Sequence, residues 1–243
     1  ELTKELFKVA DNPETMVKLG ITGIYKYIKQ LGLSNQKSKN IYLLSKQLVE
    51  KFQREIADFY GAPFAVATDS CTHAMELCLR YSPPAPGVEL TIPSRTYISV
   101  PFTLMKLKLN WHFVDEVWQN YYYVNGTNIV DAAVFFQKGG YIDGTYMCLS
   151  FQFKKTLSLG RGGAILLDNK KDYDALSRMA YDGRSNDRPW KEQNINSIGY
   201  HYYMTPETAE LGSHKLKSAV AKPSQGSADY PYLPDMDVFK NLN

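Results

Sequence analysis

The sequence predicts a three-layer α/β/α domain with a mostly parallel central sheet covered by helices on both faces. From residue 61 onward, short apolar runs alternate with amphipathic runs, which is typical of strands and crossover helices. The chain has 243 residues, enough for one such domain with a useful core. Its 44% hydrophobic and 22% charged residues are ordinary for a globular protein.

The first 60 residues form the N-terminal segment, which the sequence predicts to be helical over 14–60. Apolar residues recur there every three or four positions, at Leu44, Leu48, Phe52, Ile56 and Phe59. Gly61 provides a helix stop, and Pro63 prevents continuation.

The α/β domain is expected to span residues 61–217. We expect its strands at 64–68, 89–92, 111–114, 129–130, 146–151 and 164–167. We expect its helices at 71–80, 96–107 and 172–181. Residues 218–243 contain three prolines and many small residues, which favours a surface tail or an arm that packs on a partner.

Composition and spacing argue against several classes of function. The net charge is only +3 and the basic residues are dispersed, so we expect no nucleic-acid partner. No apolar run approaches the ~18 residues that a membrane span requires. Cys71, Cys78, Cys148 and the four histidines lack metal-ligand spacing, so we expect no metal site and a reduced, cytoplasmic location.

Ligands of open α/β sheets lie beyond the carboxyl ends of the strands, so the residues that follow each predicted strand are the candidates. Ser70 and Thr72 follow the first strand and open a helix. Free backbone N–H groups and two hydroxyls at that point can bind a phosphate. An ordinary helix cap by Ser70 explains the same residues.

A carboxylate follows the strand predicted at 129–130. Asp131 is flanked by apolar residues, where a charge needs a partner. The protonated nitrogen of a pyridine ring is one suitable partner. A capping aspartate in a turn is the simpler alternative.

The loop after the strand at 146–151 carries two adjacent lysines, Lys154 and Lys155, and then a glycine-rich stretch. A lysine with a lowered pKa in such a loop can attack a cofactor aldehyde. A plain surface loop is the alternative, and the glycines suit either a close backbone approach or a turn. Tyr97 follows another predicted strand and can stack on an aromatic ring or simply pack.

The order and spacing of these segments resemble the DegT/DnrJ/EryC1/StrS family of sugar aminotransferases, which depend on pyridoxal 5′-phosphate (PLP) and have fold type I. The resemblance covers about residues 45–217. The family motifs correspond here to Ser70-Cys71-Thr72, Pro93–Tyr97, Asp131-Ala132-Ala133, Ser150–Lys155 and Gly199–Thr205.

The resemblance implies a role for each matched residue. Lys155, rather than Lys154, is the implied Schiff-base lysine, Asp131 contacts the pyridine nitrogen, and Tyr97 stacks on the ring. Phosphate contacts are implied for Ser70, Cys71, Thr72 and Ser150. A phosphate contact is also implied for His201, and a substrate contact for Tyr203. In the family, the loop that carries these two residues reaches the partner's site, so the resemblance implies a homodimer with shared active sites.

The implied reaction moves an amino group from an amino acid, glutamate by resemblance, to a nucleotide-linked keto sugar. This chain departs from the family where Cys71 replaces a glycine and Tyr203 an arginine. By this resemblance we also expect most of the family's C-terminal domain to be absent from the sequence, as in a natural minimal form or a fragment. A non-catalytic PLP-binding or scaffolding descendant is therefore one alternative. A PLP-dependent sugar dehydratase is another, although those relatives lack the lysine that Lys155 supplies.

Overall fold

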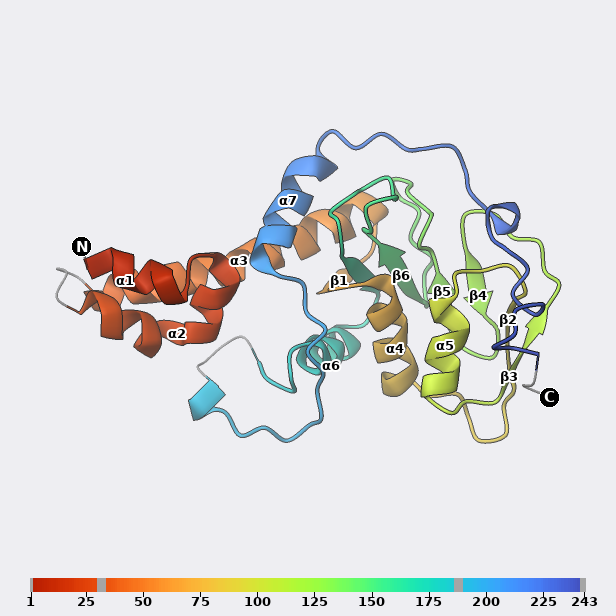
Figure 1. Ribbon diagram of the computed structural model, residues 1–243, viewed down its shortest axis with the longest axis horizontal. Coiled ribbons are helices and arrows are strands. Elements are labelled where there is room, and N and C mark those ends of the chain that lie inside the picture. The colour runs from red at the N-terminus through yellow and green to blue at the C-terminus, as the bar shows by residue number, and fades with distance from the viewer. Residues whose placement is uncertain (1, 30–33, 186–189, 241–243) are drawn as a thin grey trace.

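The computed structural model describes residues 2–29, 34–185 and 190–240. Within these residues, no helix is both long enough and apolar enough to cross a bilayer. The molecule consists of a helical N-terminal unit beside an α/β domain, and the C-terminal segment lies along that domain (Figure 1).

The N-terminal unit contains α1 (Leu2–Val9), α2 (Pro13–Ile28) and the first part of α3 (Ser34–Tyr60). The Asn12 side chain accepts a hydrogen bond from the Thr15 amide at 2.9 Å, which fixes the start of α2. The unit has a small core of its own, made of Leu6, Ala10, Met16, Ile24 and Ile28. Only α3 continues from this unit onto the sheet (Figure 1).

The predicted apolar stripe of α3 is buried only where the helix meets the sheet. Phe52 and Ile56 are fully buried, whereas Leu44 is 60% exposed. The single helical segment predicted at 14–60 consists of two helices, α2 and α3. The sequence did not predict α1, which precedes them.

The main sheet has five strands in the order β1-β7-β6-β5-β4. Their bounds are Phe64–Thr68 for β1, Tyr122–Val124 for β4, Ile129–Asp131 for β5, Tyr146–Ser150 for β6 and Gly163–Leu167 for β7. A separate parallel pair joins β2 (Leu90–Pro93) to β3 (Trp111–Val114). Two backbone hydrogen bonds and one side-chain hydrogen bond between Thr91 and Asn125 tie this pair to the end of β4.

The fold class is as predicted, but the sheet is mixed rather than mostly parallel. Of its four pairs of neighbouring strands, only β5 and β6 pair in parallel. A parallel connection needs about a dozen residues or more. The link from β4 to β5 is only residues 125–128, so these two strands form a hairpin. The link from β5 to β6 spans residues 132–145, long enough for a crossover.

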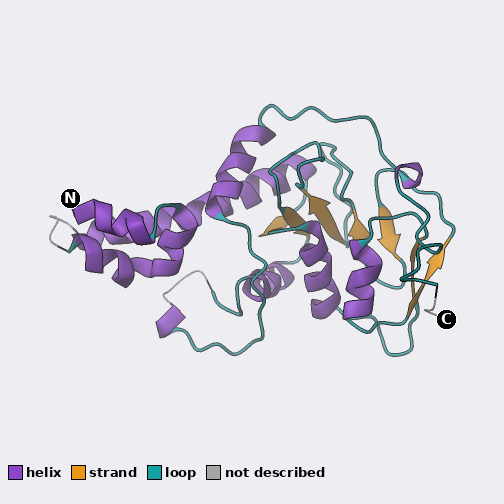
Figure 2. Cartoon of the chain, viewed as in Figure 1, coloured by secondary structure: helices purple, strands orange, loops and turns teal. Residues whose placement is uncertain are grey.

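Helices cover both faces of the sheet, which gives the three layers (Figure 2). One face packs against α3 and α7 (Pro206–Leu216), and the other packs against α4 (Cys71–Tyr81), α5 (Ser99–Lys106) and α6 (Lys170–Ala180). Alternate strand residues divide between the two cores, so Ala65 faces α3 and Val66 faces α4. Both faces are buried, which explains the near-continuous apolar runs of β6 and β7.

The segment after α7, residues 217–240, is called the strap below. It runs from α7 across the domain to β2 and β3 (Figure 1) and contains one 3-10 turn, η2 (Ser227–Asp229). Another 3-10 turn, η1 (Trp190–Glu192), precedes α7. Leu233 and Phe239 of the strap are buried. The part of the strap from Gly226 onward therefore packs on its own chain, whereas residues 217–225 are mostly exposed.

Candidate functional site

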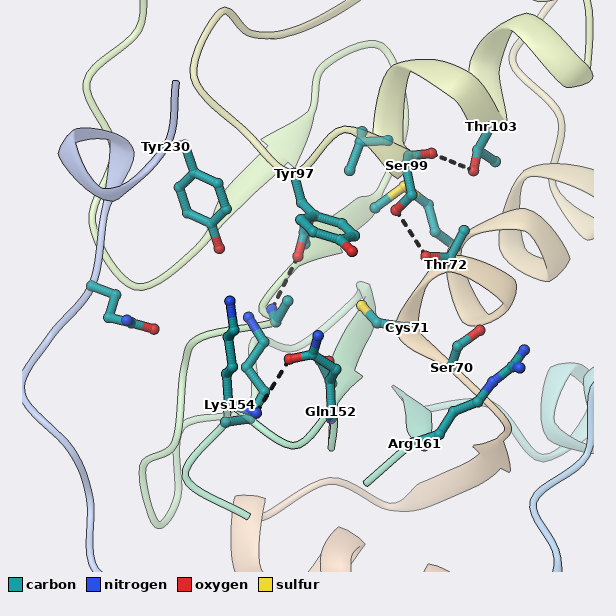
Figure 3. Close-up of a pocket in the computed structure, with 18 of the residues that line it drawn as sticks. Ser70, Cys71, Thr72, Tyr97, Ser99, Thr103, Gln152, Lys154, Arg161 and Tyr230 are labelled. Carbon is teal, nitrogen blue, oxygen red and sulfur yellow. Dashed lines mark hydrogen bonds between the residues drawn. The ribbon is translucent and has the colours of Figure 1, made fainter. Parts of the chain in front are cut away.

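A cavity of about 400 Å³ opens where β5 and β6 end and α4 begins (Figure 3). Seven of the residues that the sequence singled out line it, namely Ser70, Cys71, Thr72, Tyr97, Asp131, Ser150 and Lys155. They come from four separate segments of the chain. The location agrees with the rule that ligands bind beyond the carboxyl ends of strands.

The start of α4 forms one wall of the cavity. Ser70 is the N-cap residue, and its hydroxyl accepts a hydrogen bond from the His73 amide at 3.2 Å. The hydroxyl of Thr72 lies 2.8 Å from that of Ser99 on α5. Ser70 thus caps the helix, as its simpler interpretation predicted, and still lines the cavity. The first-turn N–H groups and the two hydroxyls together suit a phosphate.

A carboxylate lies beside this anion site and is itself neutralised. Asp69 accepts a hydrogen bond from the Arg161 guanidinium at 2.8 Å, and its other oxygen lies 2.6 Å from Nδ1 of His73. Arg161 also lines the cavity. The salt bridge between Arg161 and Asp69 places a cation at the mouth of the anion site.

The glycine-rich stretch serves a close approach of two backbones. A Cβ at Gly163 would lie 2.4 Å from the carbonyl carbon of Ser70 and 2.5 Å from the amide nitrogen of Cys71. Gly163 also pairs with Thr68 of β1 and Ser150 of β6. The absence of a side chain therefore lets the first turn of α4 sit directly on the strand that follows the lysine loop.

Asp131 is the last residue of β5 and is only 7% exposed. Tyr122 donates to one carboxylate oxygen at 2.7 Å, and the Ala133 amide donates to the other at 3.0 Å. The Tyr122 hydroxyl lies 2.5 Å from that of Thr96. Burial raises the pKa of Asp131, and the two hydrogen bonds and nearby Lys155 oppose this shift only in part.

Lys155 has the electrostatic setting of a reactive amine. Burial lowers its pKa, and the positive charge of Lys154 acts in the same direction. Cys71 and Asp131 oppose the shift. Lys154 lines the same cavity, so position alone does not distinguish the two lysines. The choice of Lys155 stays a prediction.

Three further predicted residues line the cavity in different ways. Tyr97 is 53% exposed with its ring at the cavity, which leaves a face open for stacking. Ser150 accepts a long hydrogen bond from the Gln152 amide at 3.4 Å. Burial and the nearby Asp131 raise the pKa of the Cys71 thiol, so this cysteine stays neutral.

His201 and Tyr203 do not line this cavity. The His201 ring contacts the Asp182 carboxylate at 3.2 Å, and the Tyr203 hydroxyl lies 3.2 Å from the other ring nitrogen of His201. Tyr203 lines a separate hollow between α2, α3 and α6. Their predicted roles in a partner's site therefore stay predictions.

The sequence did not indicate Tyr122, which supports Asp131 without lining the cavity, or three lining residues of the strap. Tyr122 lies on β4, a three-residue strand that has no readable period. Gln225, Asp229 and Tyr230 line the cavity from the strap, which has no periodic pattern either. Three consecutive tyrosines, residues 121–123, eight to ten positions before Asp131, were the only available signal for Tyr122.

The residues present fit the phosphate, the ring nitrogen and the aldehyde of PLP. The start of α4 supplies donors for a phosphate in a cradle that a Cβ at Gly163 would fill. At the other end of the cavity, Asp131 is a buried carboxylate without a cationic hydrogen-bond partner among the described residues. Lys155 lies between these two ends, within electrostatic reach of both Cys71 and Asp131.

Comparison with known proteins gives one family model, that of the DegT/DnrJ/EryC1/StrS aminotransferase family, which matches residues 32–135 and 136–225. Among solved structures, 3-amino-5-hydroxybenzoic acid synthase has a TM-score of 0.61 at 21% identity and covers 71% of this chain. The PLP form of the Streptococcus pneumoniae sugar aminotransferase Spr1654 has a TM-score of 0.59 at 17% identity, also over 71% of this chain. This chain covers 56% and 59% of those two structures, respectively.

The similar curated proteins are of two kinds. Endonuclease III of Rickettsia conorii is 43% identical over 60 residues, which is 25% of this chain and 29% of that protein. The 3-amino-5-hydroxybenzoate synthase of Amycolatopsis mediterranei is 43% identical over 51 residues, which is 21% of this chain and 13% of that protein. The chain thus spans less than a third of either relative.

Proposed function

Since the chain belongs to the DegT/DnrJ/EryC1/StrS aminotransferase family, we propose that it transfers an amino group from an amino acid to a keto sugar with PLP as cofactor. The observation that carries this proposal is the meeting of seven predicted residues from four segments in one cavity. The PLP form of a solved relative supports the cofactor. When bound, PLP supplies an electron sink through its protonated ring.

In this proposal Asp131 holds a proton on the ring nitrogen. Its carboxylate is buried and kept in place by Tyr122 and the Ala133 amide. Burial raises its pKa when no cation is present, so a cationic ring restores the stability of the charged form. The same pair would be weak in water, where both charges are solvated.

Lys155 is the proposed site of attachment and the proton carrier. Burial favours its neutral amine, which can accept the proton from the Cα of the amino donor. Ser70, Thr72 and the first turn of α4 hold the phosphate and so fix the distance from Lys155 to the ring. Tyr97 covers one face of the ring and keeps water from it.

Glutamate is the proposed donor and a nucleotide-linked keto sugar the proposed acceptor. One solved relative is called a sugar aminotransferase, which supports the acceptor class. The two synthases are named for an aromatic product, so the acceptor is a question for direct assay. We also propose that the protein is a cytoplasmic homodimer in which His201 and Tyr203 act in the partner's cavity.

The endonuclease III likeness supports a separate origin for part of the chain. We propose that the segment similar to endonuclease III is the N-terminal helical unit. This unit has its own core, and residues 1–31 lie outside the family match. Residues 1–60 hold ten Lys and Arg against seven Asp and Glu, and four of the lysines are paired with glutamates. This charge balance supports a structural addition rather than a nucleic-acid surface.

The first prediction separates the two lysines. Purified wild-type protein mixed with PLP should show the visible absorbance band of a lysine-bound cofactor, and glutamate should convert it to the pyridoxamine form. Lys155→Ala should abolish the band, because it removes the attachment point. Lys154→Ala is the matched control and should retain the band.

Each outcome of this experiment identifies one assignment. A band lost only in Lys154→Ala would move the attachment to that residue. A band that persists unchanged with glutamate would favour a cofactor-binding protein without turnover. The absence of a band in the wild-type protein would contradict the proposed function.

A further inference from the structure

The strap crosses the open side of the cavity and is fixed to the domain near its start. The Lys222 ammonium donates to the backbone carbonyl of Lys154 at 3.0 Å. Further along, the Asn120 amide donates to the Gln225 carbonyl at 2.8 Å. A Cβ at Gly226 would lie 2.5 Å from the Trp118 carbonyl oxygen. The strap backbone therefore docks directly on residues 118–120.

The far part of the strap is fixed equally well. The Arg95 guanidinium donates to the Tyr230 carbonyl at 2.9 Å, and the Leu233 amide donates to the Ser94 carbonyl at 2.9 Å. Leu233 and Phe239 are buried against the domain. Contacts on both sides of the cavity make this segment a wall rather than a loose tail.

The strap presents polar groups to the cavity. Gln225, Asp229 and Tyr230 line it opposite the lysine loop. The Tyr230 ring packs against Trp118 at 5.5 Å between centroids, and its hydroxyl points into the cavity (Figure 3). Burial raises the pKa of Tyr230, and the charge of Asp131 adds to the effect. The hydroxyl is therefore neutral and available as a hydrogen-bond donor.

The two sides of the cavity differ in charge. Its three cations, Lys154, Lys155 and Arg161, all come from the loop between β6 and β7. The strap adds the carboxylate of Asp229 and otherwise only neutral groups. An anionic group is favoured beside the loop and disfavoured beside the strap. Neutral hydroxyl groups can both donate to and accept from the strap side chains.

From this arrangement we propose that the strap is the substrate-facing wall of the site, and that Tyr230 and Gln225 recognise the uncharged, hydroxyl-rich ring of the amino acceptor. This inference rests on the proposed function and deepens it, because it names the residues that read the sugar part of the substrate. Tyr230 is the main recognition residue, since packing on Trp118 and the anchor from Arg95 hold its position.

The test compares Tyr230→Phe with Tyr232→Phe. Tyr232 lies on the same strap but stacks under Arg95 and lines a different hollow, so it is a matched control.

The ligands are UDP-glucose and dTDP-glucose, with UDP and dTDP as sugar-free counterparts, and calorimetry on PLP-treated protein gives each Kd. One of the two sugar nucleotides is expected to bind the wild-type protein more tightly. For that ligand, we expect Tyr230→Phe to raise the Kd about fivefold, which corresponds to the loss of one neutral hydrogen bond. The sugar-free nucleotide should bind equally to all three proteins.

Three results would overturn the inference. Tyr230→Phe could bind like Tyr232→Phe, the loss could extend equally to the sugar-free nucleotide, or the wild-type protein could bind neither sugar nucleotide. Each result is independent of the visible absorbance band, which reports on PLP and Lys155 alone. Failure of the strap inference and failure of the proposed function are therefore distinguishable.

Discussion

Asp131 shows how a single buried residue links cofactor affinity to stability. Without a cationic partner, its charge is disfavoured by burial, although Tyr122 and the Ala133 amide each donate to it. The folded-state pKa therefore lies above the usual value of 3.8 for aspartate. Between those two values the folded state binds more protons than the unfolded state, so this group makes stability fall as pH rises.

Asp131→Asn should therefore stabilise the PLP-free protein at neutral pH while weakening PLP binding. The amide has no charge to desolvate. Its oxygen can accept from the Ala133 amide while its NH2 donates to the Tyr122 hydroxyl, which can donate to Thr96 in turn. We expect the free energy of unfolding to rise by roughly 1 kcal/mol, which raises the Tm by a few degrees. We also expect the variant to lose less stability than the wild-type protein between pH 4 and 7. Thermal melts of the PLP-free forms across that range provide the check. A lower Tm for Asp131→Asn at pH 7 would show that the carboxylate is already stabilised without the cofactor.

The sequence predicted the residues that follow strands better than those that support them. Asp131 and Lys155, which both line the cavity, could be singled out because each follows a recognisable apolar run and matches a motif. Tyr122 was not found because its strand has three residues, too few for an alternation to stand out. Supporting residues of this kind depend on the pairing of strands, which one sequence does not reveal.

At the scale of elements, the site depends on the contact between β7 and the start of α4. The sequence left open whether the glycines near residue 160 serve a turn or a close approach. The structure gives Gly163 the second role, because a Cβ there would overlap the backbone of Ser70 and Cys71. The order of elements was largely predictable from apolar runs, but the directions of the strands were not, since they depend on which connections cross the sheet.

Gly163→Ala should separate α4 from β7 and destabilise the fold by roughly 1–3 kcal/mol, the usual range for overpacking. It should also weaken PLP binding, because the anion site moves away from Lys155. Gly139→Ala is the control: that position has a φ of 68° and no atom within 4 Å of the added Cβ, so it adds backbone strain alone. Urea unfolding and a PLP titration measure both effects. Equal PLP affinity in the two variants would show that the close approach does not position the site.

At the scale of the whole molecule, the chain places most of its predicted site in one cavity and two residues outside it. His201 contacts Asp182, and Tyr203 contacts His201 instead. The sequence could indicate the loop that carries them, but the periodicity of one chain does not show whether they act in their own cavity or, as proposed, in a partner's. The strap was predicted as a surface tail or a partner arm for a related reason, since nothing local indicates that Leu233 becomes buried.

Shared sites make a prediction that only mixed dimers can test. If His201 acts in the partner's cavity, Lys155→Ala and His201→Ala chains should complement each other. A mixed dimer then has one cavity with both residues intact and one with neither. Random reassortment makes about half of the dimers mixed, so about a quarter of the wild-type activity should return. We expect this recovery after the two inactive variants are unfolded together and refolded, relative to each variant refolded alone. If His201 serves its own chain, every cavity in a mixed dimer carries one defect and no activity returns.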